Sequence, residues 1–394
     1  MMTTVQRIEV DERRARLGAR HRLARRAETV EAATEALVAL HSSDPSTVFL
    51  SARARVEGFE PSRLERALYE RRSLVRLLGM RRTLFVIPSE LAGVVDAACT
   101  KALADGQWRR LVGMVAGQGI AADAGPWVDD VCRRTLDALG ARGEASAREL
   151  TADVPELGSR LAFGEGTSWA STTGLSTRVL FLLATRGQIV RVRPAGGWTS
   201  GQYRWALADA WLPGGLPDVP HDEACDELLR RYLGAFGPAT TLDIRWWTGW
   251  TARLTASTLE RIGAVHVEVD GGQAWVRDDD VRASEPVDPW VALVPSLDAT
   301  VMGWKERDWY LGEHVAELFD RNGNAGPTIW ADGRVVGGWG QAADGAVRTR
   351  LVEPVGRHVE DAVEAERRHL EAWLGDVRIR PRFRTPLERA LADR

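Results

Sequence analysis

The 394-residue sequence lacks the patterns that mark several large classes of protein. Its three cysteines, Cys99, Cys132 and Cys225, are far apart and show no ligand spacing, so neither a disulfide framework nor a zinc site is predicted. No apolar run approaches the roughly 20 residues needed to span a bilayer. The first residues also lack the apolar segment of a secretory signal. We therefore expect a cytoplasmic protein with no membrane partner.

Signals for nucleotide and cofactor chemistry are missing as well. The sequence has no glycine-rich phosphate loop, no GxGxxG that opens a helix after a strand, and no GxSxG. We expect no cofactor, no bound metal and no protein partner.

Lysine is nearly absent, since Lys101 and Lys305 are the only two among 52 basic residues. The other basic residues are arginines, whose guanidinium can hold a phosphate through two parallel hydrogen bonds. The net charge of −3 is unevenly spread: residues 1–90 hold 17 arginines against 12 acidic residues, and residues 151–206 hold six against three. GC-rich coding also explains an arginine-rich composition, but a local excess of positive charge indicates a polyanion partner.

One order of elements, helices followed by a pair of short strands, is predicted three times. In the first copy, helices cover 31–40 and 46–56, with Asp44 as N-cap and Pro45 at the first position, and a third helix begins at Pro61. Strands follow at 74–80 and 81–88 around a turn at 79–82. The second copy has helices at 127–140, 145–154 and 173–187 and strands at 188–194 and 202–207. The third has helices at 222–237, 240–250 and 255–263 and a hairpin that turns at Asp270-Gly271-Gly272.

From about residue 285 the pattern changes to short alternating apolar runs, with Asp332-Gly333 as a hairpin turn and a long amphipathic helix at 358–375. The prediction is an α+β chain of three tandem winged-helix modules followed by a C-terminal β-barrel-like or small α+β domain. The predicted modules are residues 1–117, with an N-terminal basic arm, 118–215 and 216–284. The C-terminal domain is residues 285–394.

A winged helix presents its third helix and its wing to DNA. Arginines gather on these elements in the first two copies, although some of them are expected to pair with acidic neighbours instead. Trp198 and Trp205, in the second wing, are placed to stack on bases. Asp298 and Arg307 are expected to form a structural ion pair. The predicted DNA-binding residues are Arg63, Arg66, Arg71, Arg72, Arg76, Arg81, Arg82, Arg191 and Arg193.

The corner between the first two helices, His41-Ser42-Ser43-Asp44, allows two interpretations. Two rigid elements meet there and could hold a chemical site. The same residues also fit a purely structural role, in which Ser43 or Asp44 caps the helix that begins at Pro45 and His41 closes the preceding helix.

Several segments together resemble one family, the winged-helix DNA-binding family that includes the AlkZ and YcaQ DNA glycosylases. The segments are LVALHSSDPSTVFLSARARV, LGMRRTLFVIP, RGQIVRVRP, RYLGAFGPATTLDIRWWTGW and the GRVVGGW hairpin. The resemblance covers nearly the whole chain. It implies tandem winged helices and a β-rich C-terminal domain arranged as a cradle around DNA. It also implies excision of alkylated purines, unhooking of interstrand crosslinks and, in some members, protection of producers of genotoxic compounds.

The family's catalytic motif is Gln, an apolar residue, then Gln or Asp, and the corresponding residues here are His41, Ser42 and Ser43. A purine alkylated at N7 is already a cationic leaving group, so positioning a water and stabilising the sugar cation can suffice. His41 would orient or deprotonate the water, Ser43 would assist it through a hydrogen bond, and Asp44 would supply negative charge. These three residues are the predicted catalytic set.

The prediction is therefore a DNA glycosylase that hydrolyses the glycosidic bond of bulky or N7-alkylated purines in damaged double-stranded DNA, close to the bacterial nucleoid. Because both polar positions of the motif differ here, a noncatalytic DNA-binding or regulatory protein is the alternative. A protein whose partner is not DNA is a third possibility.

Overall fold

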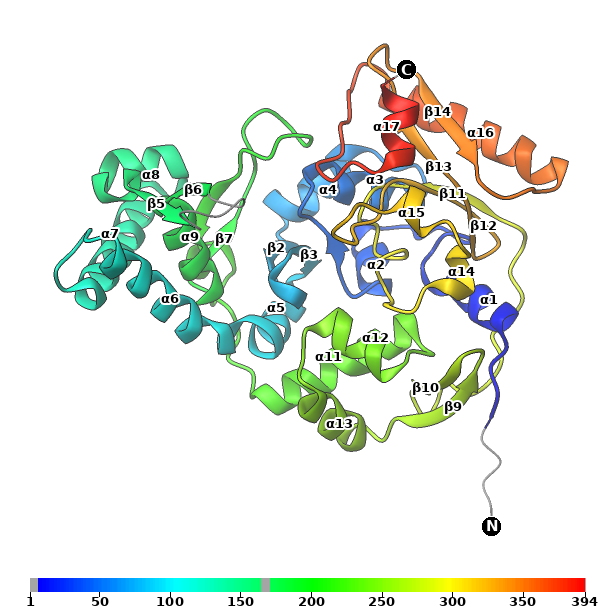
Figure 1. The fold of residues 1–394 in the computed structure, drawn as a ribbon, viewed down its shortest axis with the longest axis horizontal. Helices are drawn as coiled ribbons and strands as arrows, with labels where there is room; N and C mark the ends of the chain where they lie inside the picture. The colour runs from blue at the N-terminus through cyan, green and yellow to red at the C-terminus, as the bar shows by residue number, and fades with distance from the viewer. Residues whose placement is uncertain (1–5, 164–170, 394) are drawn as a thin grey trace.

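The computed structural model describes residues 6–163 and 171–393. It is a mixed α/β structure with a small lobe, formed by residues 104–163 and 171–187, and a large body that contains most of the other described residues (Figure 1). The small lobe stands to the left of the large body in the view of Figure 1, in cyan and green.

In the first predicted copy the helix at 46–56, the helix that begins at Pro61 and the two strands are confirmed, but the helix predicted at 31–40 ends at Ala36. Leu40 and His41 form a short strand that pairs with the strand Leu84–Pro88, so the interpretation that His41 closes the preceding helix is wrong. Asp44 caps the helix at Pro45, and strands form on both sides of the turn at 79–82. The elements are α1 (Val10–Arg20), α2 (Val30–Ala36), β1 (Leu40–His41), α3 (Pro45–Arg55), α4 (Pro61–Glu65) with its π-helical continuation η1 (Arg66–Glu70), β2 (Leu74–Leu78), η2 (Met80–Arg82) and β3 (Leu84–Pro88).

The second copy also has its predicted helices and strands, together with a hairpin, β5–β6, that the sequence patterns did not predict. Its elements, with the helical link that precedes them, are η3 (Ser89–Leu91), α5 (Ala92–Val95), η4 (Asp96–Thr100), η5 (Lys101–Leu103), α6 (Ala104–Gly117), α7 (Ala124–Arg142), β4 (Glu144–Ser146), α8 (Ala147–Asp153), η6 (Pro155–Gly158), β5 (Arg160–Phe163), β6 (Ser171–Gly174), α9 (Leu175–Thr185), β7 (Ile189–Arg191), β8 (Arg204–Leu207) and α10 (Ala208–Trp211).

The third copy has its three predicted helices and its hairpin, whose turn is Asp270-Gly271 because Gly272, predicted in the turn, begins the second strand. Its elements are α11 (His221–Phe236), α12 (Thr241–Thr248), α13 (Ala252–Arg261), β9 (Val265–Val269) and β10 (Gly272–Val276). The last part of the chain contains β11 (Val291–Val294), α14 (Asp308–Leu311), α15 (Val315–Leu318), β12 (Thr328–Ala331), β13 (Arg334–Gln341), β14 (Val347–Leu351), α16 (Arg357–Leu374) and α17 (Pro386–Ala392).

The expected C-terminal β-barrel is wrong. Strands β11–β14 form an open antiparallel sheet in sequence order, so β11 and β14 remain its edges. Four strands are too few to close around a core. Helices cover the sheet instead: α16 packs against β11 and β14, and α17 packs against β13. The alternating strand pattern and the amphipathic helix are compatible with this small α+β arrangement.

The strands of the first two copies form one six-stranded sheet, in the order β1-β3-β2-β7-β8-β4. The link between the two copies is the antiparallel pairing of β2 with β7, where Arg76 lies opposite Arg191. The small lobe has its own hydrophobic core. A larger core takes side chains from α1–α5, from α11–α13 and from residues 290–391. The six-stranded sheet therefore connects two separately packed bodies.

A fully buried ion pair joins α3 to the segment after β11. Arg55 donates to both carboxylate oxygens of Asp298, at 2.6 and 2.8 Å, and both side chains have no exposed surface. Ser51 donates to the same carboxylate, and Arg55 also donates to Thr300 Oγ1. The expected pair of Asp298 with Arg307 is wrong, because Arg307 donates to the Trp304 carbonyl and lies over the Trp246 and Phe319 rings.

Replacing Arg55 by Met should destabilise the protein by about 3–5 kcal/mol, because Asp298 would be left as a buried charge without its partner. The free energy of unfolding is measured from urea denaturation curves. The matched control is Arg133→Met, which removes an exposed arginine that pairs with Asp130 and Asp137 and should cost at most about 1 kcal/mol. Equal, small losses for the two variants would show that the buried pair is not a major stabilising contact.

Candidate nucleic-acid interface and active site

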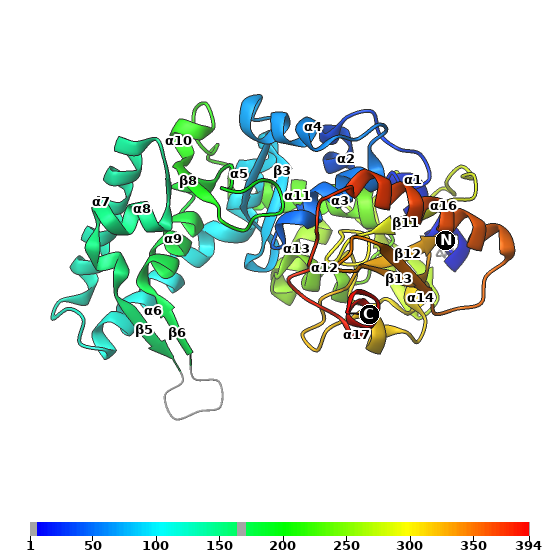
Figure 2. The same ribbon diagram turned by 90° about the horizontal axis from the view of Figure 1, so that it is seen from above.

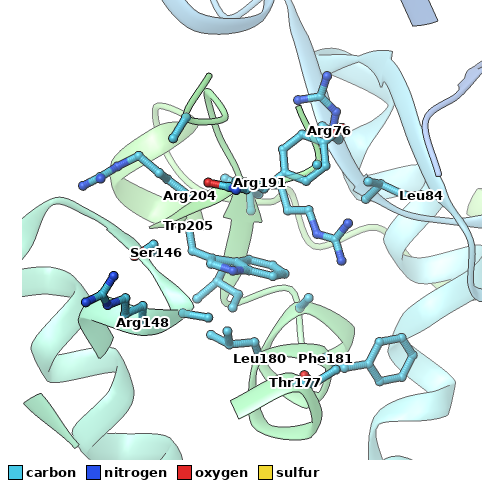
Figure 3. Close-up of a pocket in the computed structure, with 18 of the residues that line it drawn as sticks. Arg76, Leu84, Ser146, Arg148, Thr177, Leu180, Phe181, Arg191, Arg204 and Trp205 are labelled. Carbon is cyan, nitrogen blue, oxygen red and sulfur yellow. The ribbon is translucent and has the colours of Figure 1, made fainter. Parts of the chain in front are cut away.

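A cleft of about 1200 Å³ lies between the large body and the small lobe. One wall comes from the large body: Ser43 before α3, Pro45 at the start of α3, part of β2, and Leu84 of β3. The other wall comes from α8, α9 and the β7–β8 strands (Figure 3). Apolar side chains form much of the surface, namely Leu77, Leu78, Leu84, Leu180, Phe181, Ile189, Val190 and Trp205.

Arg76, predicted to bind DNA, lies in this cleft and is held in place by neutral groups. Its Nε donates to Ser42 Oγ at 2.8 Å, and a terminal nitrogen donates to the Tyr69 hydroxyl at 3.0 Å. Its guanidinium lies 4.8 Å from the centre of the Tyr203 ring. Of the described residues, no carboxylate is within ion-pair distance of Arg76, so its positive charge is not neutralised by a salt bridge.

Arg191, the second predicted residue that reaches the cleft, comes from β7 on the opposite side. Its guanidinium lies 4.9 Å from the Trp205 ring centre and extends into the open space between Trp205 and Leu84 (Figure 3). Burial lowers the pKa of Arg191 to about 10, and the charges of Arg76 and Arg382 act in the same direction. Arg191 is still fully charged at neutral pH.

Arg382 also lines the cleft, although it was not among the predicted site residues. It lies in the segment between α16 and α17, and its backbone N–H donates to Asp44 Oδ2 at 2.7 Å. The arginine-rich run DVRIRPRFR was the available sequence signal. Nothing in that run indicates that it meets the first helices in space. Arg148 and Arg178, on α8 and α9, are two further lining arginines that sequence reasoning missed.

Three predicted DNA-binding residues, Arg63, Arg66 and Arg71, surround a different pocket of about 380 Å³. Arg63 donates to backbone carbonyls, including that of Glu57, and Arg71 forms an ion pair with Glu31. This pocket shares no lining residue with the large cleft. DNA binding by these three residues remains a prediction.

The other four predicted arginines have different surroundings. Arg72 donates to the Trp211 carbonyl and covers that ring, and Arg193 forms an ion pair with Glu65 at 2.9 Å. Arg81 packs 3.9 Å from the ring centre of Trp246 on α12, and Arg82 is exposed. Their binding to DNA also stays a prediction.

His41 is 5% exposed and lies behind the cleft wall rather than on it. Its partner across the β1–β3 ladder is Phe85, and the two rings meet edge to face. Side chains alternate between the faces of a sheet, so His41 and Phe85 lie on one face while Ser42, bonded to Arg76, lies on the other. Burial lowers the pKa of His41 to about 3, with the charge of Arg81 adding to the effect.

Ser43 and Asp44 follow directly. Ser43 lines the cleft, and its backbone N–H points to His41 Nδ1 at 3.4 Å. Asp44 is buried and caps α3: its Oδ1 accepts from the backbone N–H and the hydroxyl of Ser46. Its Oδ2 accepts from Arg382. Of the predicted catalytic set, Ser43 is therefore the member that the structure places on the cleft surface.

The two tryptophans expected to stack on bases differ. Trp198 packs between Phe49 and Trp373, with ring centres 5.0 and 5.8 Å away, so it is part of an aromatic cluster. Trp205 lines the cleft beneath Arg191.

The part of the chain that the structure describes has no group of His, Cys, Asp and Glu side chains suited to a metal ion. Over the same residues, no helix combines the length and the apolarity that a membrane crossing requires.

A cleft with apolar walls and uncompensated arginines from separate parts of the chain is characteristic of proteins that bind a polyanion. The family model described as "DNA glycosylase AlkZ-like" matches residues 34–376, and the chain belongs to this AlkZ-like DNA glycosylase family. The enzyme class predicted from the sequence is thereby confirmed.

Among solved structures, the DNA glycosylase AlkZ of Streptomyces sahachiroi is similar in fold, with a TM-score of 0.73. The match covers 95% of this chain and 99% of that chain at 21% sequence identity. No curated protein matches the sequence.

The depressed pKa of His41 should appear as pH-dependent stability. In the unfolded chain a histidine takes up a proton below about pH 6.5, whereas folded His41 stays neutral down to about pH 3. The contribution of neutral His41 to the free energy of unfolding is therefore complete above about pH 6.5 and is lost as the pH falls. The loss is about 2 kcal/mol between pH 7 and pH 5. His21, equally buried with a pKa of about 3, adds a similar loss.

The measurement compares unfolding free energies at pH 7 and pH 5 for the wild type and for His41→Gln. The variant should lose about 2 kcal/mol less on acidification than the wild type. An identical loss in both proteins would mean that His41 titrates normally in the fold.

Proposed function

We propose that the cleft between the two bodies binds damaged double-stranded DNA and that the enzyme hydrolyses the glycosidic bond of purines that carry a bulky or alkyl group at N7. The observation that carries this proposal is the position of Ser43 on a cleft whose walls hold Arg76 and Arg191 from opposite sides. Pockets of roughly 300–1,000 Å³ hold drug-sized ligands, and this cleft of about 1200 Å³ has room for more than a single base.

The chemistry assigns different work to the three residues of the corner. An N7-alkylated purine leaves without protonation, so the enzyme has to place a water and stabilise the sugar cation. In this proposal the Ser43 hydroxyl contacts the water. His41, with a pKa of about 3, is too weak a base to deprotonate water effectively. Its role in this proposal is to orient Ser43, whose backbone N–H donates to the neutral imidazole.

We further propose that the three helix-and-hairpin copies are winged-helix modules with the boundaries predicted from the sequence. The order α2, α3, α4, β2–β3 supports this for the first copy, and α11, α12, α13, β9–β10 supports it for the third. Crosslink unhooking and self-resistance to a genotoxin follow as proposed roles, with the chromosome in the cytoplasm as the place of action.

Wild-type protein should release the adducted base from duplex DNA that contains an N7-methyl, nitrogen-mustard or larger N7 adduct, and abasic product is measured under single-turnover conditions. Ser43→Ala should slow excision by about 100-fold, the range found when a group that assists the reacting water is removed, while DNA affinity stays unchanged. Thr177→Ala, which removes a hydroxyl from the opposite wall of the same cleft, should excise at the wild-type rate.

Equal rates for Ser43→Ala and wild type would remove Ser43 from the mechanism. Tight DNA binding by the wild type without release of any of the three adducts would instead favour the noncatalytic DNA-binding protein.

A further inference from the structure

The segment between α16 and α17, residues 375–385, runs along the side of the large body that faces the small lobe (Figure 2). Hydrogen bonds fix it at both ends. Gln341 accepts from the Ile379 N–H at 2.8 Å and donates to the Val377 carbonyl at 3.0 Å. At the other end, Thr385 caps α17, whose Leu387 is part of the large core. Residues 380–384 therefore span a short distance between two fixed points.

Asp44 holds the middle of this segment at the cleft. Its Oδ1 serves the cap of α3, through Ser46, while its Oδ2 accepts from the Arg382 N–H. Asp44 is 3% exposed, and no ion pair neutralises it among the described residues. One buried carboxylate thus connects the start of α3 to a segment more than 300 positions away along the chain.

The consequence of this connection is that three guanidinium groups from three elements line one cleft. Arg76 comes from β2, Arg191 from β7 and Arg382 from the C-terminal segment. Arg76 lies opposite Arg191 where β2 pairs with β7, and the charges of Arg76 and Arg382 both act to lower the pKa of Arg191, so each of them repels Arg191. The described residues offer none of them a carboxylate partner, and Arg76 is buried as well. The repulsion between these like charges decreases when an anion binds among them.

Among the residues that the structure describes, Glu149 is the one acidic residue that lines the cleft, and it already has partners. It accepts from the Ser146 N–H in the cap of α8 and forms an ion pair with Arg204 at 3.2 Å. Arg142, another lining residue, is paired with Asp153. The cluster of Arg76, Arg191 and Arg382 therefore differs from Arg142 and Arg204, which line the same cleft with their charges balanced by carboxylates.

We propose that Arg191 and Arg382, with Arg76 behind them, form a single phosphate-binding subsite for the DNA backbone next to the damaged nucleotide, and that Asp44 is its positioning residue. The proposal rests on the proposed function, which places DNA in this cleft. Asp44 acts through its neighbours: it holds Arg382 at the subsite and caps α3, which places Ser43 at the same cleft. One carboxylate then sets the distance between the phosphate contact and the reacting sugar.

The first test compares Arg382→Ala with Arg380→Ala, which removes the same charge from an exposed position two residues away that does not line the cleft. Affinity for duplex DNA is measured between 50 and 200 mM salt. Loss of one phosphate contact lowers the slope of log K against log salt by about 0.9, so Arg382→Ala should show this change and Arg380→Ala should keep the wild-type slope. Identical slopes in the two variants would overturn the subsite.

The second test uses Asp44→Asn, whose Oδ1 can still cap α3 but whose amide NH₂ cannot accept from the Arg382 N–H. Counting charge alone, removal of a carboxylate near DNA should strengthen binding. The positioning role predicts weaker binding with the reduced slope of Arg382→Ala, and a double variant no weaker than either single one. Ser46→Ala is the control, because it removes a cap contact of Asp44 and leaves the contact with Arg382.

Stronger binding by Asp44→Asn, or additive losses in the double variant, would overturn the positioning role. The outcome is separate from that of the proposed function. If wild type excises the adducted base and Arg382→Ala binds and excises like Arg380→Ala, the subsite is wrong and the glycosylase reading stands. If the slope changes as expected but no adduct is released, the subsite stands and the proposed substrate is wrong.

Discussion

The buried ion pair between Arg55 and Asp298 is the contact on which the position of the site depends. It fixes the C-terminal end of α3, a helix whose residues from Ser46 to Arg55 are all buried. The N-terminal end is fixed by Asp44 through Arg382. Both contacts lead to the last hundred residues, so that part of the chain serves as the support against which α3 presents Ser43. A helix that is buried on all sides cannot adjust its direction without disturbing both ends.

Local signals in the sequence predicted local structure well. Asp44 followed by Pro45 marks a helix start wherever the backbone permits, and Asp270-Gly271 supplies the turn residues that a two-residue hairpin loop needs. The partners of the strands could not be predicted. Arg76 lies opposite Arg191 because two strand edges more than 100 residues apart meet, and an alternating pattern says which residues form a strand but not which edge it joins. For the same reason, the sequence could not show that the C-terminal strands form an open sheet and not a barrel.

The arginines show a similar limit. Arg76 and Arg191 were predicted from their places in the hairpins, and both line the cleft. Arg71, predicted from its place on the third helix, and Arg193, predicted from its place in a hairpin, form ion pairs with Glu31 and Glu65. A guanidinium has five donors and a long apolar stem, so it can serve a carbonyl, an aromatic ring or a carboxylate as readily as a phosphate. Which of these partners an arginine has depends on where the acidic residues lie in three dimensions. Local sequence patterns do not give those positions.

The uncompensated positive charge of the cleft affects how strongly the proposed substrate and its product would bind. A nucleotide with an N7-alkylated purine carries a positive base and a negative phosphate, so its net charge is close to zero. Hydrolysis releases a neutral N7-alkylated base and a proton from the attacking water, and it leaves the negative phosphate on the abasic product. In the proposed function, a subsite built from Arg191 and Arg382 therefore attracts the abasic product more strongly than the substrate, because repulsion between the arginines and the cationic purine disappears on cleavage. While the bond breaks, however, the positive charge passes to the sugar, so this repulsion does not by itself favour cleavage, and the sugar cation still has to be stabilised within the cleft.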